Sequence, residues 1–232
     1  MPAHTRADKA ATAVVQVGPP PVTNKRPQRN HLIPSWVLKV TMAVTGTLWA
    51  AFLAIHLFGN LKVFQGAQAY NHYAHWLREA FYPLLPKLSV LWAMRVVLGL
   101  ALLAHICADA MIWWRGREAR GPHRAKIRGA RAWGAWLMPL TGILIGCFIV
   151  IHVLDLTLGL GIQSAGFAAP ISDESFAYEN LVASFRRPAM ACFYCLVMLL
   201  LAIHVAKGFT TMASDLGAMG RRWRATLALI GG

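Results

Sequence analysis

Four of the nine histidines in the sequence lie inside long apolar stretches, at His56, His105, His152 and His204. Each stretch holds one of them. Imidazole is a common metal ligand and also exchanges protons near neutral pH. A polar side chain within a stretch of this kind is costly to bury and usually carries a function. The pattern therefore points to metal or proton chemistry inside a membrane.

The stretches that must position these histidines are long enough to span a bilayer. A hydrocarbon core of about 30 Å needs about 20 apolar residues in a helix that rises about 1.5 Å per residue. The sequence is 57% hydrophobic and 14% charged, whereas a soluble domain is about 25% charged. It predicts an all-α transmembrane helical bundle with one histidine in each of four spanning helices. The spans run roughly Trp36–Leu61, Ser89–Trp114, Trp133–Leu160 and Pro188–Ala213.

The sequence carries 23 Lys and Arg against 9 Asp and Glu, a net charge of +14. The basic residues cluster before the first span, between the second and third spans at 115–131, and after the fourth at Arg221–Arg224. Basic clusters that alternate with apolar runs indicate cytoplasmic loops rather than a surface for nucleic acid. We therefore expect a multi-pass membrane protein with a cytoplasmic N-terminus and no nucleic-acid partner.

The same pattern divides the chain into three regions. Residues 1–31 form a polar, basic tail that we expect in the cytoplasm, and residues 32–224 form the transmembrane domain. Residues 225–232 are too few to cross a bilayer, so we interpret them as the start of a possible further helix. No internal repeat is evident in the sequence.

The depths of the four histidines group them into two pairs. The helix rise places His56 and His152 about 30 and 24 Å from the cytoplasmic edge, and His105 and His204 about 14 and 15 Å from it. Two imidazoles from different helices at one depth can take both axial positions of a haem. The sequence therefore predicts two stacked b haems, an inner and an outer one. Glycines that would admit the porphyrin are Gly46, Gly99, Gly142 and Gly146.

Several motifs around these histidines resemble the single-chain, di-haem cytochrome b subunit of succinate dehydrogenase or fumarate reductase, the membrane anchor of complex II, in its actinobacterial form. The motifs are Ile55–Leu61, Ser89–Trp92 with Arg95, Ile151–Asp155, Val182–Phe185 and Gly220–Arg224. The resemblance implies a complex in the bacterial cell membrane, with a flavoprotein and an iron–sulfur subunit docked on the cytoplasmic side. It also implies menaquinone as the electron acceptor.

The sequence departs from that family in two places. The family has a fifth membrane helix after the position of Arg221–Arg224, which is missing from the sequence. Some fumarate-reducing relatives carry a glutamate two residues before the histidine that corresponds to His204, and Ala202 stands there in this chain. This favours succinate oxidation over fumarate reduction, although the sequence leaves the physiological direction open.

A quinone pocket is expected in the loop that leaves the first span, near His56. The segment Tyr70–Tyr82 is amphipathic, which is typical of an interfacial helix that caps a bundle. Its polar residues would meet a quinone headgroup with hydrogen-bond donors and a proton-exchanging carboxylate. These candidates are His72, His75, Arg78 and Glu79, of which Glu79 lies close to the position of a quinol-linked glutamate in the family the chain resembles.

Arg95 lies ten residues before His105 in the second span. The helix rise places it about 15 Å nearer the outer face than that histidine. There it can pair with a propionate of the outer haem or with Glu79. The alternative is an interfacial arginine whose long side chain extends to the headgroups.

The four cysteines also lie in the spans. We interpret them as small, buried packing residues. A Rieske-type [2Fe–2S] cluster, with two Cys and two His ligands, is the alternative that Cys107, Cys192 and Cys195 suggest. Helix geometry weakens it, because Cys107 and Cys195 lie about 200° and about 180° round their helices from the histidines of those helices.

Three functions remain open from the sequence. The leading one is an electron-transfer subunit of succinate dehydrogenase. The others are a transporter or channel whose histidines relay protons or bind a metal, and a structural anchor without haem. A reduced-minus-oxidised visible spectrum and the haem content per chain separate the three.

Overall fold

The structure is a computed structural model that describes residues 32–120, 130–171, 174–217 and 220. No strand occurs among these residues, which confirms the all-α prediction. In chain order the helices are α1 (Ser35–Asn60), α2 (Ala67–Glu79), α3 (Ser89–Arg120), α4 (Ala130–His152), α5 (Ala177–Phe185) and α6 (Pro188–Asp215). The predicted tail 1–31 and the segment 225–232 lie outside the described residues.

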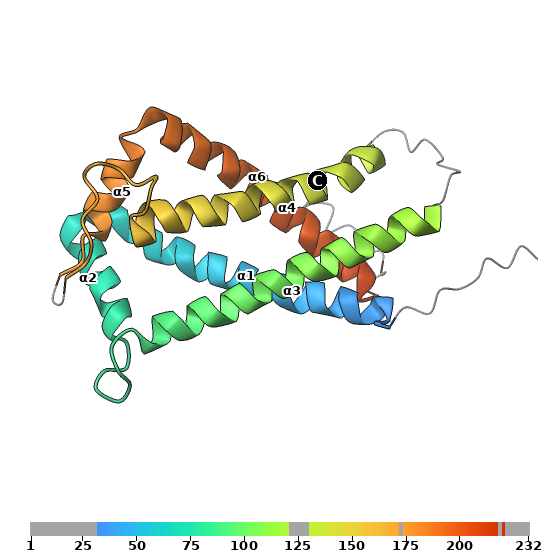
Figure 1. Ribbon diagram of the computed structural model, residues 1–232, viewed down its shortest axis with the longest axis horizontal. Coiled ribbons are helices and arrows are strands. Elements are labelled where there is room, and N and C mark those ends of the chain that lie inside the picture. The colour runs from blue at the N-terminus through green and yellow to red at the C-terminus, as the bar shows by residue number, and fades with distance from the viewer. Residues whose placement is uncertain (1–31, 121–129, 172–173, 218–219, 221–232) are drawn as a thin grey trace, which may run out of the picture. The chain divides into compact units, whose positions relative to one another are not determined.

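Within the described part of the chain, α1, α3, α4 and α6 are long and apolar enough to cross a membrane (Figure 1). Each carries one of the four histidines, so the predicted spans are confirmed with two adjustments. α3 runs on to Arg120, so Arg115 and Arg117, expected in a loop, lie on its last turns. The third span ends in a π-helical turn, Val153–Leu158, rather than in regular α-helix.

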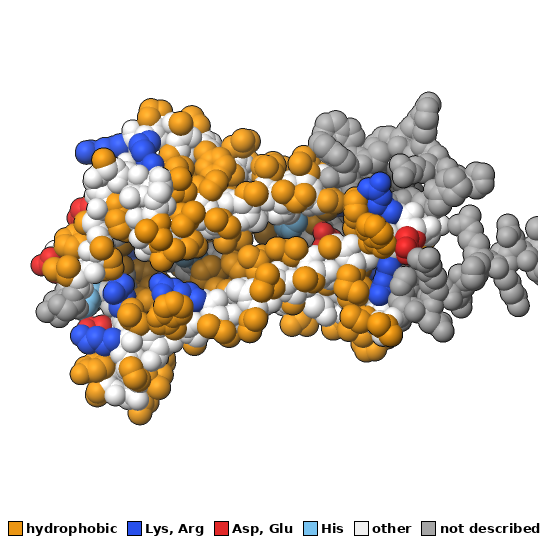
Figure 2. Space-filling view, in the orientation of Figure 1, with side chains coloured by type: hydrophobic (Ala, Val, Ile, Leu, Met, Phe, Trp, Pro, Cys, Tyr) orange, Lys and Arg blue, Asp and Glu red, His pale blue; other side chains and the backbone are white. Residues whose placement is uncertain are grey.

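The surface of the bundle is apolar along its middle. Figure 2 shows hydrophobic side chains there, with charged side chains gathered towards the two ends. Large apolar side chains are exposed along the spans, for example Phe58 at 73% and Leu199 at 65%. Surface of this kind is stable against lipid but not against water. The chain is therefore a multi-pass membrane protein.

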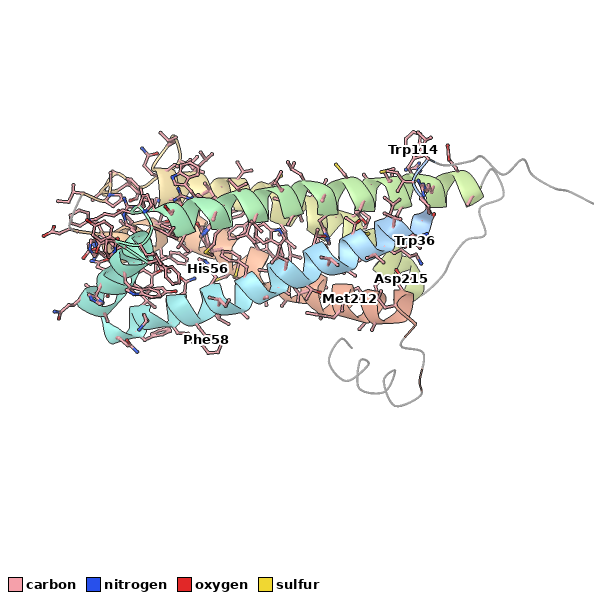
Figure 3. The ribbon with its side chains drawn as sticks, turned by 90° about the horizontal axis from the view of Figure 1, so that it is seen from below. Trp36, His56, Phe58, Trp114, Met212 and Asp215 are labelled. Atoms are coloured by element: carbon pink, nitrogen blue, oxygen red, sulfur yellow. The ribbon has the colours of Figure 1, made fainter. Side chains whose placement is uncertain are left out.

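Polar contacts join the spans at one end of the bundle, where Trp36 and Asp215 lie (Figure 3). Lys39 Nζ lies 2.6 Å from an Asp215 carboxylate oxygen, which ties α1 to α6. Arg115 donates to Ser35 Oγ at 3.0 Å, which ties α3 to α1. Tryptophan and basic side chains are typical of a membrane interface.

The spans pair as two helical hairpins. α1 packs on α3 and α4 packs on α6, and the hairpins meet through α1 and α6. α1 and α4 run in one direction along the bundle, and α3 and α6 run in the other (Figure 1). This is the arrangement of a parallel duplication, in which the two halves are related by an axis along the membrane normal.

The sequence carries the same duplication, so the expectation of no internal repeat is wrong. Residues 45–56 read TGTLWAAFLAIH, and residues 141–152 read TGILIGCFIVIH. The segments agree at six of twelve positions, which are Thr, Gly, Leu, Phe, Ile and His. The positions between them differ, mostly among apolar residues, because lipid and loose packing accept many side chains there, and this conceals the repeat.

The other end of the bundle is covered by α2 and α5, which lie together there (Figure 1). Tyr70 donates to Asn60 at 2.7 Å, which holds α2 against the end of α1. Asn71 donates to Glu179 at 2.8 Å, which joins α2 to α5. α2 corresponds to the predicted amphipathic segment, whereas α5 was not predicted.

Candidate functional site

The inner histidines, His105 and His204, are each held by a threonine from the other helix of the same hairpin. His105 Nδ1 lies 2.9 Å from Thr45 Oγ1 of α1. His204 Nδ1 lies 2.9 Å from Thr141 Oγ1 of α4. The threonines open the two copies of the repeat. Their role was not predicted from the sequence, and the repeat is the signal that would have revealed it.

A glycine follows each threonine and lets the imidazole approach the helix closely. A Cβ at Gly46 would lie 3.3 Å from His105 Cε1, and a Cβ at Gly142 would lie 3.5 Å from His204 Cε1. A longer side chain at either position would displace the ring. The Nδ1 edge of each ring therefore faces its own hairpin, which leaves the Nε2 edge directed away from the threonine.

The outer histidines, His56 and His152, lie side by side. Their ring centroids are 5.9 Å apart and their planes meet at 87°. Each ring also stacks on the phenylalanine one turn earlier, Phe52 at 5.4 Å and Phe148 at 5.6 Å between centroids. Both phenylalanines belong to the repeat. Stacking limits rotation of the two imidazoles and keeps them facing each other between the hairpins.

The two histidine levels are well separated along the bundle. In α1, His56 follows Thr45 by eleven residues, and in α4, His152 follows Thr141 by the same eleven. The threonines mark the inner level, so the helix rise gives a separation of about 16 Å in both hairpins.

The paired imidazoles fit haem b. A metal–imidazole bond of about 2 Å on each side of an iron places the two ring centroids about 6 Å apart, as the outer pair is. At the inner level, His105 and His204 occupy equivalent positions in the two hairpins, each beside its threonine. Each level takes one ring from each hairpin, which is how a helical bundle ligates a planar group.

A buried carboxylate lies on the π-helical turn Val153–Leu158, close to the outer pair. Asp155 is 1% exposed. It accepts hydrogen bonds from Ser184 Oγ and from Arg187, the latter at 2.5 Å. Arg187 also donates to the carbonyl of Ile162 at 2.6 Å. Turns of π-helix are frequent at functional sites, and this one buries an acid that its partners fully compensate.

Tyr194 connects this carboxylate to the outer histidines. Its hydroxyl lies 3.5 Å from Asp155 Oδ2 and 3.3 Å from His152 Nδ1. The chain of contacts runs from His152 through Tyr194 and Asp155 to Arg187, whose side chain is 33% exposed. These contacts were not predicted, because the burial of an acid cannot be deduced from one sequence.

At the end of the bundle that α2 and α5 cover, α2 places His75 against Glu79. His75 Nε2 lies 3.2 Å from a Glu79 carboxylate oxygen, one turn along the helix. Lys87, in the loop that follows, lies 2.5 Å from the other oxygen. The structure therefore brings two of the predicted quinone-site residues together and adds a lysine that the sequence analysis missed.

These contacts set the charge of the carboxyl and leave one imidazole nitrogen available. The hydrogen bond from Lys87 holds the pKa of Glu79 below its ordinary value of 4.5, partial burial opposes that shift, and the nearby His75 reinforces it. His75 Nδ1 is buried and has no hydrogen-bond partner within the described residues. A buried polar atom without a partner is costly, so this nitrogen suits the oxygen of a ligand.

The other residues predicted for this site have different surroundings. His72 is exposed on α2. Arg78 contributes its backbone carbonyl, which accepts from the Leu88 amide at 2.6 Å. The guanidinium of Arg95 lies over the ring of Trp92, 4.9 Å from its centroid.

The cysteines are exposed on the spans. The interpretation that they are buried packing residues is therefore wrong. Among the described residues, no three His, Cys, Asp or Glu side chains gather as a metal-binding group. A Rieske-type cluster needs four such ligands, so the arrangement of Cys107, Cys192 and Cys195 does not favour the iron–sulfur alternative.

The fold and the paired histidines define a multi-pass helical membrane protein with a ligand pair at each of two depths. Residues 114–232 match the family model described as succinate dehydrogenase/fumarate reductase transmembrane subunit. The chain belongs to this family and is a membrane anchor subunit of complex II. Members of the family commonly bind haem b. No match was found among curated proteins or among solved structures.

Proposed function

We propose that this chain is the electron-transfer subunit of a succinate dehydrogenase in a bacterial cell membrane. It passes electrons from the iron–sulfur subunit through two b haems to menaquinone. The observation that carries the proposal is the pairing of histidines at two depths, with the outer rings 5.9 Å apart. Each depth takes one ring from each hairpin, so the duplicated fold supplies two complete sets of axial ligands.

In this proposal His105 and His204 hold the inner haem, and His56 and His152 hold the outer one. Haem bound in this way supplies a reversible one-electron carrier at each depth. Levels about 16 Å apart, by the helix rise, cover much of a hydrocarbon core of about 30 Å. Two carriers are needed when electrons travel from one face of the membrane to the other, and one carrier would suffice for an acceptor near the donor.

The donor side is the end of the bundle with the basic segments, which we assign to the cytoplasm together with the N-terminus. Residues 115–131 carry more positive charge than orientation alone requires. Lipid phosphates are one partner for it. We assign part of this segment, with Arg221–Arg224, to docking the iron–sulfur subunit, although 121–129 and 221–224 lie outside the described residues.

That docking assignment is tested by neutralising Arg124, Lys126 and Arg128 together. The flavoprotein and iron–sulfur subunits should co-purify less well with the variant, and the loss should grow with salt because screening weakens the remaining charges. An intact complex at high salt would leave only the lipid interpretation.

We place menaquinone reduction at the outer end, at His75 and Glu79. The buried Nδ1 of His75 can donate to a quinone carbonyl when both ring nitrogens carry a proton, and Glu79, 3.2 Å from Nε2, orients the ring. Reduction of the quinone to the quinol takes up two electrons and two protons. Glu79, whose side chain is 32% exposed, can pass the protons inward from the outer side.

This arrangement couples the reaction to the membrane potential. Electrons move from the negative inside to the positive outside, which the potential favours by about 2.3 kcal/mol per charge per 100 mV for a full crossing. That contribution would offset a small driving force between succinate and a low-potential quinone. Succinate:menaquinone activity in intact membranes should therefore fall when an uncoupler is added.

Reduced-minus-oxidised spectra of the purified complex test the ligand assignment. His204→Ala should remove the inner haem and keep the outer one, and His152→Ala should do the reverse. Haem content per chain gives the stoichiometry. A wild-type complex without haem, or a single substitution that leaves both haems fully occupied with unchanged spectra, would overturn the proposal.

A further inference from the structure

Three of the four histidines that we assign to haem have a side-chain hydroxyl at Nδ1. The pairs are Thr45 with His105, Thr141 with His204, and Tyr194 with His152. A neutral imidazole carries one proton, and the partner of one ring nitrogen decides which nitrogen holds it. The same choice decides which nitrogen keeps a lone pair for a metal.

The inner hydroxyls already have an acceptor for their single proton. Thr45 Oγ1 lies 2.7 Å from the carbonyl of Thr41, and Thr141 Oγ1 lies 2.8 Å from the carbonyl of Leu137. A carbonyl can only accept, so each threonine donates to its own helix. The hydroxyl oxygen is then left as an acceptor for Nδ1–H of the histidine.

The Tyr194 hydroxyl at the outer level has the same direction of donation, but its acceptor is a charged carboxylate. Tyr194 lies between His152 Nδ1 and Asp155 Oδ2. An ionised carboxylate only accepts, so the tyrosine proton points to Asp155 and its oxygen accepts from the histidine. Ser184 donates to the same oxygen, Oδ2, and Arg187 contacts Oδ1, which holds the carboxylate in place.

We infer that Thr45, Thr141 and Tyr194 are positioning residues that hold their histidines in the Nδ1-protonated tautomer. Each ring then presents Nε2 as the iron ligand, and in His105 and His204 this nitrogen lies on the ring edge away from the threonine. The inference rests on the proposed di-haem function, and it adds the residues that prepare the ligands before iron binds.

The two ends of the bundle differ in the strength of this effect. The hydrogen bonds behind the inner histidines lead through a threonine to a neutral backbone carbonyl. Those behind His152 lead through Tyr194 to the Asp155 carboxylate. Hydrogen bonds in series polarise one another, and an anionic partner behind a ligating imidazole makes it a stronger electron donor to the metal. A stronger donor stabilises the oxidised iron, so Tyr194 and Asp155 should lower the potential of the outer haem.

Tyr194→Phe tests the outer chain, because it removes the hydroxyl and keeps the aromatic ring. Redox titration of the purified complex, followed by visible and electron paramagnetic resonance spectra, should show a higher midpoint potential for the outer haem and no change at the inner one. An unchanged outer potential, or an equal shift at both haems, would overturn the role of Tyr194.

Thr45→Val and Thr45→Ser test the inner chain as a matched pair. Valine keeps the shape and removes the hydroxyl, so it should change the g values of the inner haem or lower its occupancy. Serine keeps the hydroxyl and should restore the wild-type signature. Thr47→Val is the control, because that hydroxyl contacts Met212 instead of a histidine.

The outcomes separate this inference from the proposed function. Wild-type complex without haem would defeat the proposed function and this inference with it. Two normal haems in wild type, together with wild-type spectra in Thr45→Val, would overturn only the tautomer role of the threonine. Equal loss of the inner haem from the valine and serine variants would also overturn that role, because serine retains the acceptor.

Discussion

The inner and outer histidine pairs stand on the same duplicated hairpin but differ in what lies behind the rings. Behind the inner pair the two hairpins match, with a threonine 2.9 Å from each Nδ1. Behind the outer pair only the stacked phenylalanines match. Asp155 and Tyr194 of the second hairpin correspond, at offsets of 96 and 99 residues, to Gly59 and Arg95 of the first.

This difference separates two properties of the molecule. The duplication fixes where ligands occur, because every copy of the repeat ends in a histidine. Divergence between the copies determines the polarity around the outer ligands. The inner histidines have equivalent threonines, whereas the outer pair has a carboxylate and an arginine on one side only, together with the cap formed by α2 and α5. The asymmetry lies at the end where we place proton uptake, and the symmetrical end has only electrons to relay.

The largest effect on haem content is expected when a bulky side chain displaces one of the inner histidines. Gly46→Leu would drive a side chain into His105, whose Cε1 lies 3.3 Å from the Cβ position. The variant should lose the inner haem and keep the outer one, as measured by haem content and difference spectra. Ala51→Leu is the control, since Ala51 lies on the same helix and is exposed. Full haem content in Gly46→Leu would contradict the tight fit of the ring.

At the outer end, Glu79→Gln should abolish quinone reduction without removing a haem. The amide cannot pass protons to His75, whereas both haems should remain reducible by dithionite. The measurement is turnover with a soluble menaquinone analogue, with Glu174→Gln of the other outer loop as control. Full turnover in Glu79→Gln would remove this residue from the mechanism, and a quinone found only beside the inner haem would exclude the outer site.

Stability should also differ between the two ends. Asp155→Ala leaves Arg187 without its buried partner and should destabilise the protein by about 3 kcal/mol, the low end for a broken buried pair because Arg187 is partly exposed. Thr141→Val removes one neutral hydrogen bond at the inner end and should cost about 1 kcal/mol. Unfolding in detergent measures both. Equal losses of unfolding free energy would mean that Asp155 and its partners contribute no more to stability than a single threonine.

The smallest effect concerns the ionisation of Glu79. Its pKa in the folded protein lies below 4.5, chiefly through Lys87. The contacts of the carboxylate therefore stabilise the fold above that pH, and this contribution is lost as the pH falls through the folded-state pKa. In Lys87→Met the carboxyl should titrate at a higher pH, as measured by its infrared band. An unchanged titration would mean that Lys87 does not set the charge of Glu79.

Much of the architecture was determined by the sequence alone. Hydrophobic length predicted the four spans, and the count of residues along each helix predicted that His56 pairs with His152, whose rings lie 5.9 Å apart. Depth along a membrane helix is a linear function of residue number, so it needs no knowledge of neighbouring helices. The amphipathic pattern likewise predicted α2, together with the closeness of His75 and Glu79, which are one turn apart.

Only the tertiary structure decided what surrounds those residues. The partners of the histidines, namely Thr45, Thr141 and Tyr194, lie 42 to 63 residues away in sequence. Asp155 meets Ser184 and Arg187 through a π-helical turn that no periodicity predicts. The physical reason is that a single sequence gives the height of a residue on its helix, whereas the angle it presents and the helix it meets are set by packing. Hydrogen bonds in an apolar interior depend on those angles, so the ligands could be predicted and their partners could not.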